Sequence, residues 1–203
     1  MAYLGTQPND VKKNTGLYTP SEILQLTKDG SWGGSLELIE EQTVSSVSAV
    51  DFTSIQESKF DVHFLTWEDF DYSFDGTRLI MQFYESGVLE TASVYQYATQ
   101  HGESGGTFSE QRNTGDSDLR IGGGTGNDTN EKANGYVYIY NAGNSSKYTF
   151  ITTQNLDFQN TVFRFEFGGG VLPQASTVDG FRLKMHDTGT FSGTAKLYGV
   201  KQI

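Results

Sequence analysis

The feature that most constrains this chain is a two-residue alternation of side chains in its last third. Successive side chains of a β-strand point to opposite faces of a sheet, so an alternating run is expected to cover a core with one face and meet water with the other. Five runs show this pattern or close it: residues 134–141, 147–154, 161–167, 178–187 and 193–201. They predict the strands of one sheeted domain.

The alternation also predicts which side chains lie inside. In the run 161–167, Phe163, Phe165 and Phe167 alternate with Val162, Arg164 and Glu166, so we expect the three phenylalanines on the core face. In the run 178–187, Phe181, Leu183 and Met185 alternate with Arg182, Lys184 and His186, and the same argument applies. The expected solvent faces are therefore the charged ones.

The middle of the chain continues the same pattern with glycine, aspartate and serine between the runs. Further strands are expected at residues 35–41, 42–52, 60–68, 77–86 and 93–101, with a short candidate at 119–121. Residues 102–118 and 122–133 are polar or glycine-rich and are expected to be loops. About ten short strands with turn signals predict an all-β fold, an antiparallel jelly-roll-like β-sandwich over residues 35–203.

The first 34 residues are expected to be separate from the sandwich. Residues 1–18 show no periodicity and predict an extended arm. Thr19, Pro20 and Glu22 have the spacing of a helix N-cap, a first-turn proline and a capping-box glutamate, so a short helix is expected to follow and to end at 29–30. We interpret the segment 1–34 as an attachment segment, whose candidate contact residues are Tyr3, Leu4, Leu17, Tyr18, Ile23 and Leu24.

Composition excludes several classes of function. The chain has 203 residues, no cysteine and a net charge of −11, so thiolate metal sites and disulfides are ruled out and a nucleic-acid partner is not expected. No apolar run approaches the roughly 20 residues that span a bilayer, and residues 1–14 lack the apolar core of a signal peptide. We expect synthesis in the cytoplasm and no membrane insertion.

No set of residues predicts catalysis. His63, His101 and His186 have no motif beside them and are interpreted as cross-strand surface or rim residues. Four carboxylates, Glu68, Asp69, Asp71 and Asp75, gather near aromatics as in glycoside hydrolases, but residues 67–75 are expected to be one solvated acidic loop between two strands. We expect no catalytic residue and no cofactor.

One glycine-rich segment resembles part of a metal-binding repeat. Residues 123–129 (GGTGNDT) match the first part of the calcium-binding nonapeptide, but Asn130 stands where an apolar residue is required and there is one copy only. A loop explains the segment more simply, and no metal site is predicted. Whether Asp116, Asp118 or Asp128 binds calcium is left open by the sequence.

Two groups of exposed-face residues are candidate contact sites. Tyr136, Tyr138 and Tyr140 share one side of their strand, and Tyr95 and Tyr97 precede the long loop. These tyrosines either stack on glycan, fill a subunit interface or form half of a two-sided core. The basic side chains of the late strands are Arg164, Arg182, Lys184 and Lys196. They either form a patch or pair with carboxylates across strands, and pairing is the preferred interpretation.

The last third resembles a module common in structural proteins of tailed bacteriophages. The family pattern G-x-I-x-I-Y-N matches Gly135, Val137, Ile139, Tyr140 and Asn141, and Tyr148 follows near the start of the next strand. The patterns G-I/F-R-F/L and S-G-T-x-x-L-Y-G match Gly180, Phe181, Arg182, Leu183, Ser192, Gly193, Thr194, Leu197, Tyr198 and Gly199. Upstream, DGTRLIMQFYESG is similar to a family strand in which Gln82 replaces the usual arginine.

The resemblance covers about residues 50–201 and implies a role as well as a fold. It implies a non-enzymatic virion component, displayed outward as a tail fibre, tail-associated protein or capsid decoration. The N-terminal arm lies outside the resemblance, and its expected role as the anchor rests on its lack of periodicity. Expected partners are portal, tail or capsid subunits and other copies of the chain, in a homotrimer. The alternative is a lectin-like module that recognises host surface glycan, with Tyr95, Tyr97, Tyr136 and Tyr138 as candidate contacts to glycan or to a subunit interface. A depolymerase using the carboxylates of residues 67–75 is the remote third possibility.

Overall fold

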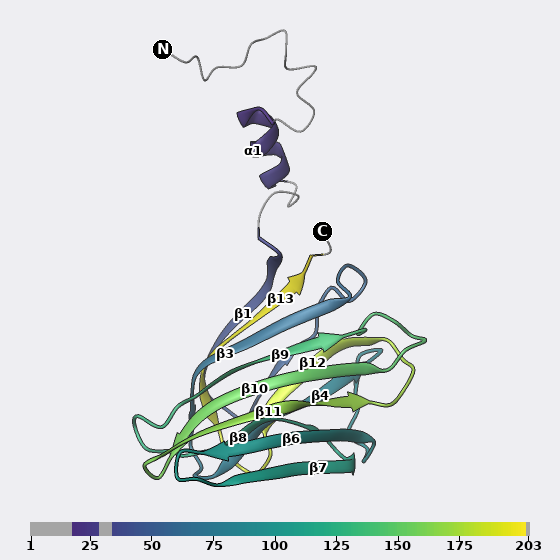
Figure 1. The fold of residues 1–203 in the computed structure, drawn as a ribbon. Coiled ribbons are helices and arrows are strands. Elements are labelled where there is room, and N and C mark those ends of the chain that lie inside the picture. Colours follow the sequence, from purple (N-terminus) through teal and green to yellow (C-terminus); the bar gives the residue numbers. More distant parts are fainter. Residues whose placement is uncertain (1–17, 29–33, 202–203) are drawn as a thin grey trace, which may run out of the picture. The chain divides into compact units, whose positions relative to one another are not determined.

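The computed structural model describes residues 18–28 and 34–201 and divides the chain into two units at Ser35. In the described part of the chain, the first unit contributes one helix, α1 (Pro20–Lys28), and the strands belong to the second unit (Figure 1). Thr19 caps the helix as predicted, because its hydroxyl oxygen accepts a hydrogen bond from the Glu22 amide at 3.3 Å while the Glu22 carboxylate accepts one from the Thr19 amide at 2.7 Å.

The larger sheet, sheet A, has eight antiparallel strands in the order β1-β13-β3-β9-β10-β11-β6-β7. Sequence neighbours β9, β10 and β11 form its centre, and β7 lies at one edge (Figure 1). The bounds in this order are Leu36–Val47, Phe191–Val200, Val62–Tyr72, Ala133–Tyr140, Thr149–Gln159, Val162–Leu172, Tyr95–Glu103 and Phe108–Asp116.

The smaller sheet, sheet B, has five antiparallel strands. Four follow the order β2-β12-β4-β5, and β8 pairs with β4. Their bounds are Ala49–Phe52 (β2), Val178–Met185 (β12), Thr77–Glu85 (β4), Val88–Leu89 (β5) and Leu119–Thr125 (β8). The predicted all-β antiparallel sandwich with one short helix near the N-terminus is therefore confirmed, with thirteen strands in the described residues where about ten were expected.

The core lies between the two sheets and is rich in aromatic rings. Phe181 of β12 stacks on Phe52 of β2 with ring centroids 4.9 Å apart, and Phe70 of β3 stacks on Phe191 of β13 at 5.0 Å. Phe181 is fully buried, as are its strand neighbours Leu183 and Met185, so the face predicted for residues 178–187 is confirmed. Aromatic pairs of this kind add about 0.5–1.5 kcal/mol beyond the apolar area they bury.

Two segments predicted to be loops are strands. Strand β7 lies within residues 102–118; it is polar and largely exposed because it is an edge strand held through backbone pairing with β6, so it shows no apolar alternation. Strand β8 extends through three glycines to Thr125. A Cβ atom at Gly123 would lie 2.5 Å from Asp157 Oδ2, and one at Gly124 would lie 2.7 Å from the Gly76 carbonyl oxygen. The glycines allow close packing of the strand.

The acidic segment 67–75 is also different from the prediction. Strand β3 continues to Tyr72, so Glu68, Asp69 and Asp71 lie on a strand and the turn is shorter than expected. Asp69 has a positive φ of 53°, at an irregularity in the pairing of β3 with β9 and β13. The sequence alone did not distinguish this bulge from a loop, because both place polar residues in succession.

Candidate functional site

The central strand β11 faces the opposite way from the prediction. Phe163 and Phe167 are exposed, with 43% and 49% of their surfaces accessible, whereas Glu166 is only 1% accessible. The alternation itself is present, but the phenylalanines point outward and the charged side chains point between the sheets. The prediction that Phe163, Phe165 and Phe167 lie on the core face is wrong, because buried partners for Arg164 and Glu166 stabilise the reverse orientation.

Outward-facing side chains of β9, β10 and β11 form a continuous surface that we name the aromatic face. Its members are Tyr136, Tyr138, Tyr140, Phe150, Thr152, Gln154, Leu156, Phe158, Phe163, Phe165 and Phe167. None of these side chains is charged, in a chain with 39 lysine, arginine, aspartate and glutamate residues (14 basic and 25 acidic). Apolar surface this concentrated is typical of a contact site.

Strand register brings the aromatic face together. Gln154 of β10 pairs with Tyr136 on one side and Phe167 on the other, and Phe158 pairs with Phe163 across the β10–β11 hairpin. Directly opposed side chains on one face of a sheet are close neighbours. The rings of Phe165 and Phe167 stack with centroids 6.1 Å apart.

The aromatic face has two chemically different halves. In the tyrosine half, the Tyr136 hydroxyl donates to Gln154 Oε1 at 2.8 Å, and the Tyr140 hydroxyl lies 3.2 Å from Thr152 Oγ1. Tyr136, Gln154, Phe167 and their neighbours line a shallow groove of about 570 Å³. The phenylalanine half carries no polar side-chain atom and consists of Leu156, Phe158, Phe163, Phe165 and Phe167, of which Phe167 also borders the groove. One half can hydrogen-bond a ligand and the other can only exclude water.

A buried ion pair fixes the orientation of β11. Arg120 of β8 donates from Nε to Glu166 Oε1 at 2.5 Å and from Nη2 to Glu166 Oε2 at 2.8 Å, and the Thr99 hydroxyl donates to Oε1 at 2.5 Å. The two charged side chains are 11% and 1% exposed. Buried charges persist only when they are paired and hydrogen-bonded. This pairing keeps Glu166 inside and therefore Phe165 and Phe167 outside.

A second buried network lies beneath the same strands. Arg164 donates from Nε to Asp157 Oδ1 at 3.0 Å, and Asn155 Nδ2 donates to Asp157 Oδ2 at 2.7 Å. The Trp67 indole donates to Asn155 Oδ1 at 3.3 Å. Burial raises the pKa of the Asp157 carboxyl, and the Arg164 charge opposes that rise. The network is a polar part of the core, not an open site.

The predicted tyrosine contacts do not share one face. Tyr136 and Tyr138 belong to the aromatic face, but Tyr95 is fully buried: its hydroxyl accepts from the Phe83 amide at 2.9 Å and donates to the Glu90 carbonyl at 3.1 Å. Tyr97 packs against the core from the inner side of β6, and its hydroxyl donates to Asp116. Tyr95 is therefore not a candidate contact residue. Tyr97 lies on the inner side of sheet A, opposite the aromatic face. The two-sided-core interpretation of Tyr136 and Tyr138 does not hold either, since Val137 and Ile139 fill the core side.

The candidate attachment residues are only partly described. Tyr3, Leu4 and Leu17 lie outside the described residues, as does the expected end of the helix at 29–30. On the described part, Tyr18 and Leu24 are exposed, with 52% and 55% accessible surface, and Ile23 is partly buried. An apolar side chain with the exposure of Leu24 is available to a partner.

The predicted histidines and carboxylates do not form a site. His63 is fully buried, contrary to its interpretation as a surface residue, and its Nε2 donates to the Ile55 carbonyl at 2.8 Å. His101 is also buried, beside Glu103 at 3.1 Å. Glu68 pairs with Lys196 and Asp71 with Lys132. Within residues 18–28 and 34–201, no group of three or more metal-ligating side chains is gathered.

Asp116, Asp118 and Asp128 are not a calcium cluster in the described structure. Asp116 accepts hydrogen bonds from Tyr97, Asn113 and the Ser117 amide, while Asp128 lies in the loop after β8. Asp118 is buried, and that burial raises the pKa of its carboxyl, with the Asp116 charge adding to the rise.

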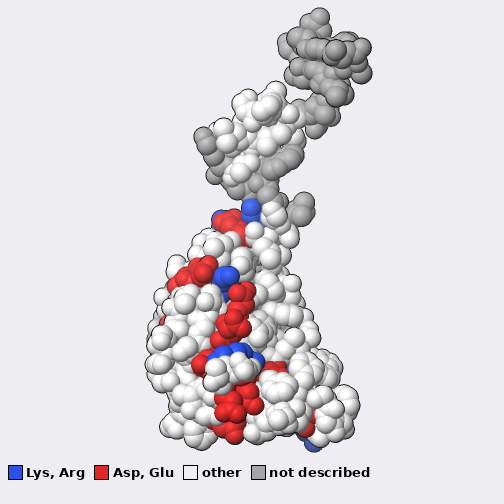
Figure 2. Space-filling model, turned by 90° about the vertical axis from the view of Figure 1, so that its left-hand side faces the viewer, with Lys and Arg blue, Asp and Glu red and all other residues white. Residues whose placement is uncertain are grey.

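The conspicuous basic side chains are dispersed, and three of them pair with carboxylates as the preferred interpretation predicted. Arg182 forms a two-point contact with Asp51 at 2.7 and 2.9 Å on sheet B, whereas Arg164 lies inside the sandwich. One side of the molecule shows acidic and basic atoms interleaved in a band (Figure 2). A separate basic patch of Arg164, Arg182, Lys184 and Lys196 is not present, because these residues belong to different faces.

Comparison with known proteins adds no identification. No protein-family model matches the chain, and no curated protein matches it significantly. No helix among the described residues is long and apolar enough to cross a membrane.

Proposed function

We propose that this chain is a non-enzymatic structural component of a tailed-phage virion, in which the aromatic face joins copies of the chain to one another. The observation that carries the proposal is the uncharged, exposed phenylalanine half of the aromatic face, around Phe163 and Phe167. Exposed apolar patches of this extent mark interaction sites. The motif resemblance supports the virion assignment, with display as a tail fibre, tail-associated protein or capsid decoration.

The lack of charge on this face favours another copy of the same chain as its partner. Each copy carries a net charge of −11, so two copies repel each other at most other surfaces. The aromatic face can be buried without bringing like charges together or leaving a charge unpaired. Three such faces can close around a three-fold axis, and the proposed assembly is a homotrimer.

Attachment to the particle is assigned to the segment 1–34. Its described part presents Tyr18, Ile23 and Leu24 on or next to the short helix. An isolated helix of nine residues is marginal in water, and docking on portal, tail or capsid subunits would stabilise it. Deletion of residues 1–18 should leave a folded sandwich that no longer joins the particle, and normal incorporation of the truncated protein would refute this role.

Oligomeric state tests the proposed interface. Wild-type protein and a Phe163→Ser/Phe167→Ser variant would be compared by sedimentation velocity, with Phe74→Ser as the matched control. Phe74 is 51% exposed, close to the 49% of Phe167, but lies in the turn after β3. We expect trimers for the wild type and the control and monomers for the double variant. A monomeric wild type, or a double variant that still forms trimers, would reject the interface.

A lectin-like receptor-binding module is the second candidate function. It is favoured by the groove of the tyrosine half, where ring faces lie beside the Tyr136 hydroxyl, the Thr152 hydroxyl and the Gln154 amide. Such a combination can stack on a sugar ring and hydrogen-bond its hydroxyls. Binding of the multivalent wild-type protein to a glycan array, and its loss on Tyr138→Ala, would support this function; silence of the array would remove it.

A further inference from the structure

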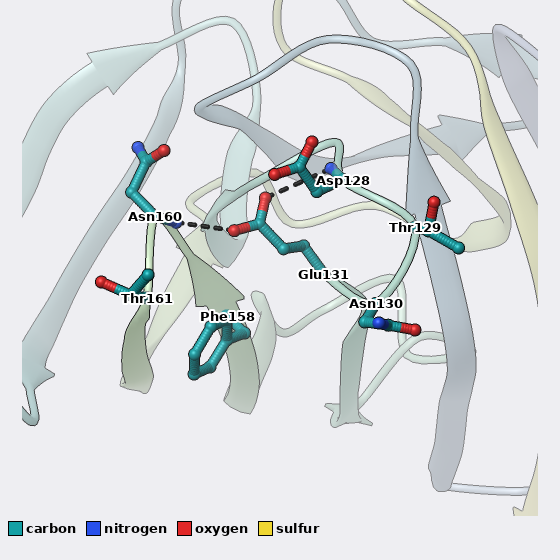
Figure 3. A pocket seen from close by; sticks show the side chains of 7 residues that line it. All are labelled: Asp128, Thr129, Asn130, Glu131, Phe158, Asn160 and Thr161. Atoms are coloured by element: carbon teal, nitrogen blue, oxygen red, sulfur yellow. Dashed lines mark hydrogen bonds between the residues drawn. The ribbon is translucent and has the colours of Figure 1, made fainter.

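A polar pocket lies at the end of the β10–β11 hairpin, where the loop after β8 approaches the hairpin turn (Figure 3). It has a volume of about 790 Å³ and is open to solvent on one side. Phe158 provides its aromatic part. The remaining lining residues come from the loop and the turn and are Asp128, Thr129, Asn130, Glu131, Asn160 and Thr161.

Glu131 holds the two walls of this pocket in place. Its Oε1 accepts a hydrogen bond from the Asn160 amide of the hairpin turn at 2.6 Å, and its Oε2 accepts one from the Asp128 amide of the loop at 3.2 Å (Figure 3). Glu131 is 7% exposed. A Cβ atom at position 126 would lie 1.7 Å from Glu131 Oε2, so Gly126 makes room for the carboxylate. The pocket is therefore preorganised before any ligand binds.

The other polar side chains of the pocket have unused hydrogen-bonding capacity. Asp128, Thr129, Asn130, Asn160 and Thr161 are exposed, and within the described residues their side chains make no hydrogen bond to the protein. Together they contribute two side-chain amides, two hydroxyls and one carboxylate to the lining of the pocket, and Phe158 contributes a ring. Amides and hydroxyls both donate and accept, which suits a ligand that carries many hydroxyl groups.

We propose that this pocket binds one neutral hexopyranose residue of a glycan, with a face of the sugar on Phe158 and its hydroxyls toward Asn130 and Asn160. A sugar ring combines an apolar face with a polar rim, and the pocket presents the same combination. Among the residues that the structure describes, no lysine or arginine lines the pocket, and Asp128 adds a negative charge, so phosphate and acidic sugars are disfavoured. The inference rests on the lectin-like candidate function above, and it excludes burial of Phe158 between copies of the chain.

The test uses the full-length chain and the methyl glycosides of glucose, galactose, mannose, N-acetylglucosamine and rhamnose. Saturation-transfer-difference NMR would detect binding, and titration would give the dissociation constant. We expect a value of about 1 mM for a single sugar residue. Asn160→Gly removes the side-chain amide of residue 160 and allows the positive φ of 50° at this turn. Asn130→Ala removes the other amide, and Asn127→Ala is the matched control, an exposed residue of the same loop outside the pocket.

We expect binding of at least one neutral methyl glycoside, weakened about three- to tenfold by Asn160→Gly or by Asn130→Ala, the range of one lost hydrogen bond. Asn127→Ala should bind as the wild type does. Binding that both pocket variants retain in full, or that Tyr138→Ala alone abolishes, would reject the pocket and leave the lectin-like function standing. Absence of binding to every methyl glycoside and to a glycan array would reject both.

Discussion

Arg120 and Glu166 join the two sheets of the sandwich through a two-point ion pair, with N–O distances of 2.5 and 2.8 Å between β8 of sheet B and β11 of sheet A. The pair is almost completely withdrawn from solvent. It decides which side of β11 is inside, and thereby places three phenylalanines on the outside. The aromatic face is thus a consequence of a buried charge pair beneath it.

Removal of one member of this pair should be far more harmful than removal of both. Glu166→Ala leaves the Arg120 guanidinium buried without its partner, and we expect the free energy of unfolding to fall by about 3–5 kcal/mol. Arg120→Leu/Glu166→Leu should lose less than Glu166→Ala alone, because no charge remains uncompensated. Urea denaturation followed by tryptophan fluorescence would measure both.

The partly exposed Arg182–Asp51 pair on sheet B provides the control for that comparison. Its side chains are 31% and 35% exposed, so Asp51→Ala should cost about 1 kcal/mol or less. Equal losses for Glu166→Ala and Asp51→Ala would show that the buried pair does not have the role described here.

The glycine run of β8 should not tolerate a side chain at its centre. Gly123→Ala would bring a methyl group to 2.5 Å from Asp157 Oδ2, next to the Arg164 contact. We expect a loss of about 1–3 kcal/mol in the free energy of unfolding, as for other overpacked cores. Gly105→Ala is the control, because its Cβ would meet only Val162 Cγ1 at 4.0 Å. Thermal unfolding by differential scanning calorimetry would separate the two, and a Gly123→Ala protein as stable as Gly105→Ala would contradict the packing.

Stability should decrease as the pH falls through the range where free histidine titrates. Burial lowers the pKa of His63 in the folded protein, whereas in the unfolded chain the pKa of this histidine is about 6.5. Below that pH the unfolded chain binds a proton that the folded chain does not, so the free energy of unfolding falls by up to about 1.4 kcal/mol per pH unit. Above it the full stability is present.

The variant His63→Gln isolates this contribution. Glutamine keeps an N–H group that can donate toward the Ile55 carbonyl and does not titrate. The pH dependence of its unfolding free energy between pH 7 and pH 5 should be flatter than that of the wild type, as measured by urea titration at each pH. Identical slopes for the two proteins would show that His63 does not contribute.

The sequence predicted the class of fold because the alternation of β12 and β9 is simple. Phe181, Leu183 and Met185 follow the rule that apolar side chains face the core, and so do Val137 and Ile139. The strand β7 was missed because an edge strand with both faces solvated carries no apolar alternation. Only the first part of β8, residues 119–121, was predicted, because glycine, which usually interrupts strands, is here required by close packing with sheet A.

The orientation of β11 could not be predicted from its own residues. The run VFRFEF is consistent with either face inside, and apolar burial favours the phenylalanines. The decision depends on partners in other strands: Arg120 of β8, 46 residues away in the chain, for Glu166, and Asp157 of the paired strand β10 for Arg164. One local signal was available. The neighbouring strand β10 of the same sheet also places polar residues, Asn155 and Asp157, opposite Glu166 and Arg164. Two neighbouring strands with matched polar faces indicate a polar interior layer.

Hydroxyl-radical footprinting of the wild-type chain, at a concentration where it assembles and after dilution to monomers, tests whether the aromatic face points outward and joins copies of the chain. We expect Phe163 and Phe167 to be oxidised in the monomer and protected in the assembly, and Phe181, fully buried in the sandwich, to be protected in both. Protection of Phe163 and Phe167 in the monomer would show that β11 faces the other way. Equal oxidation in both states would show that the aromatic face is not the surface through which the chain assembles.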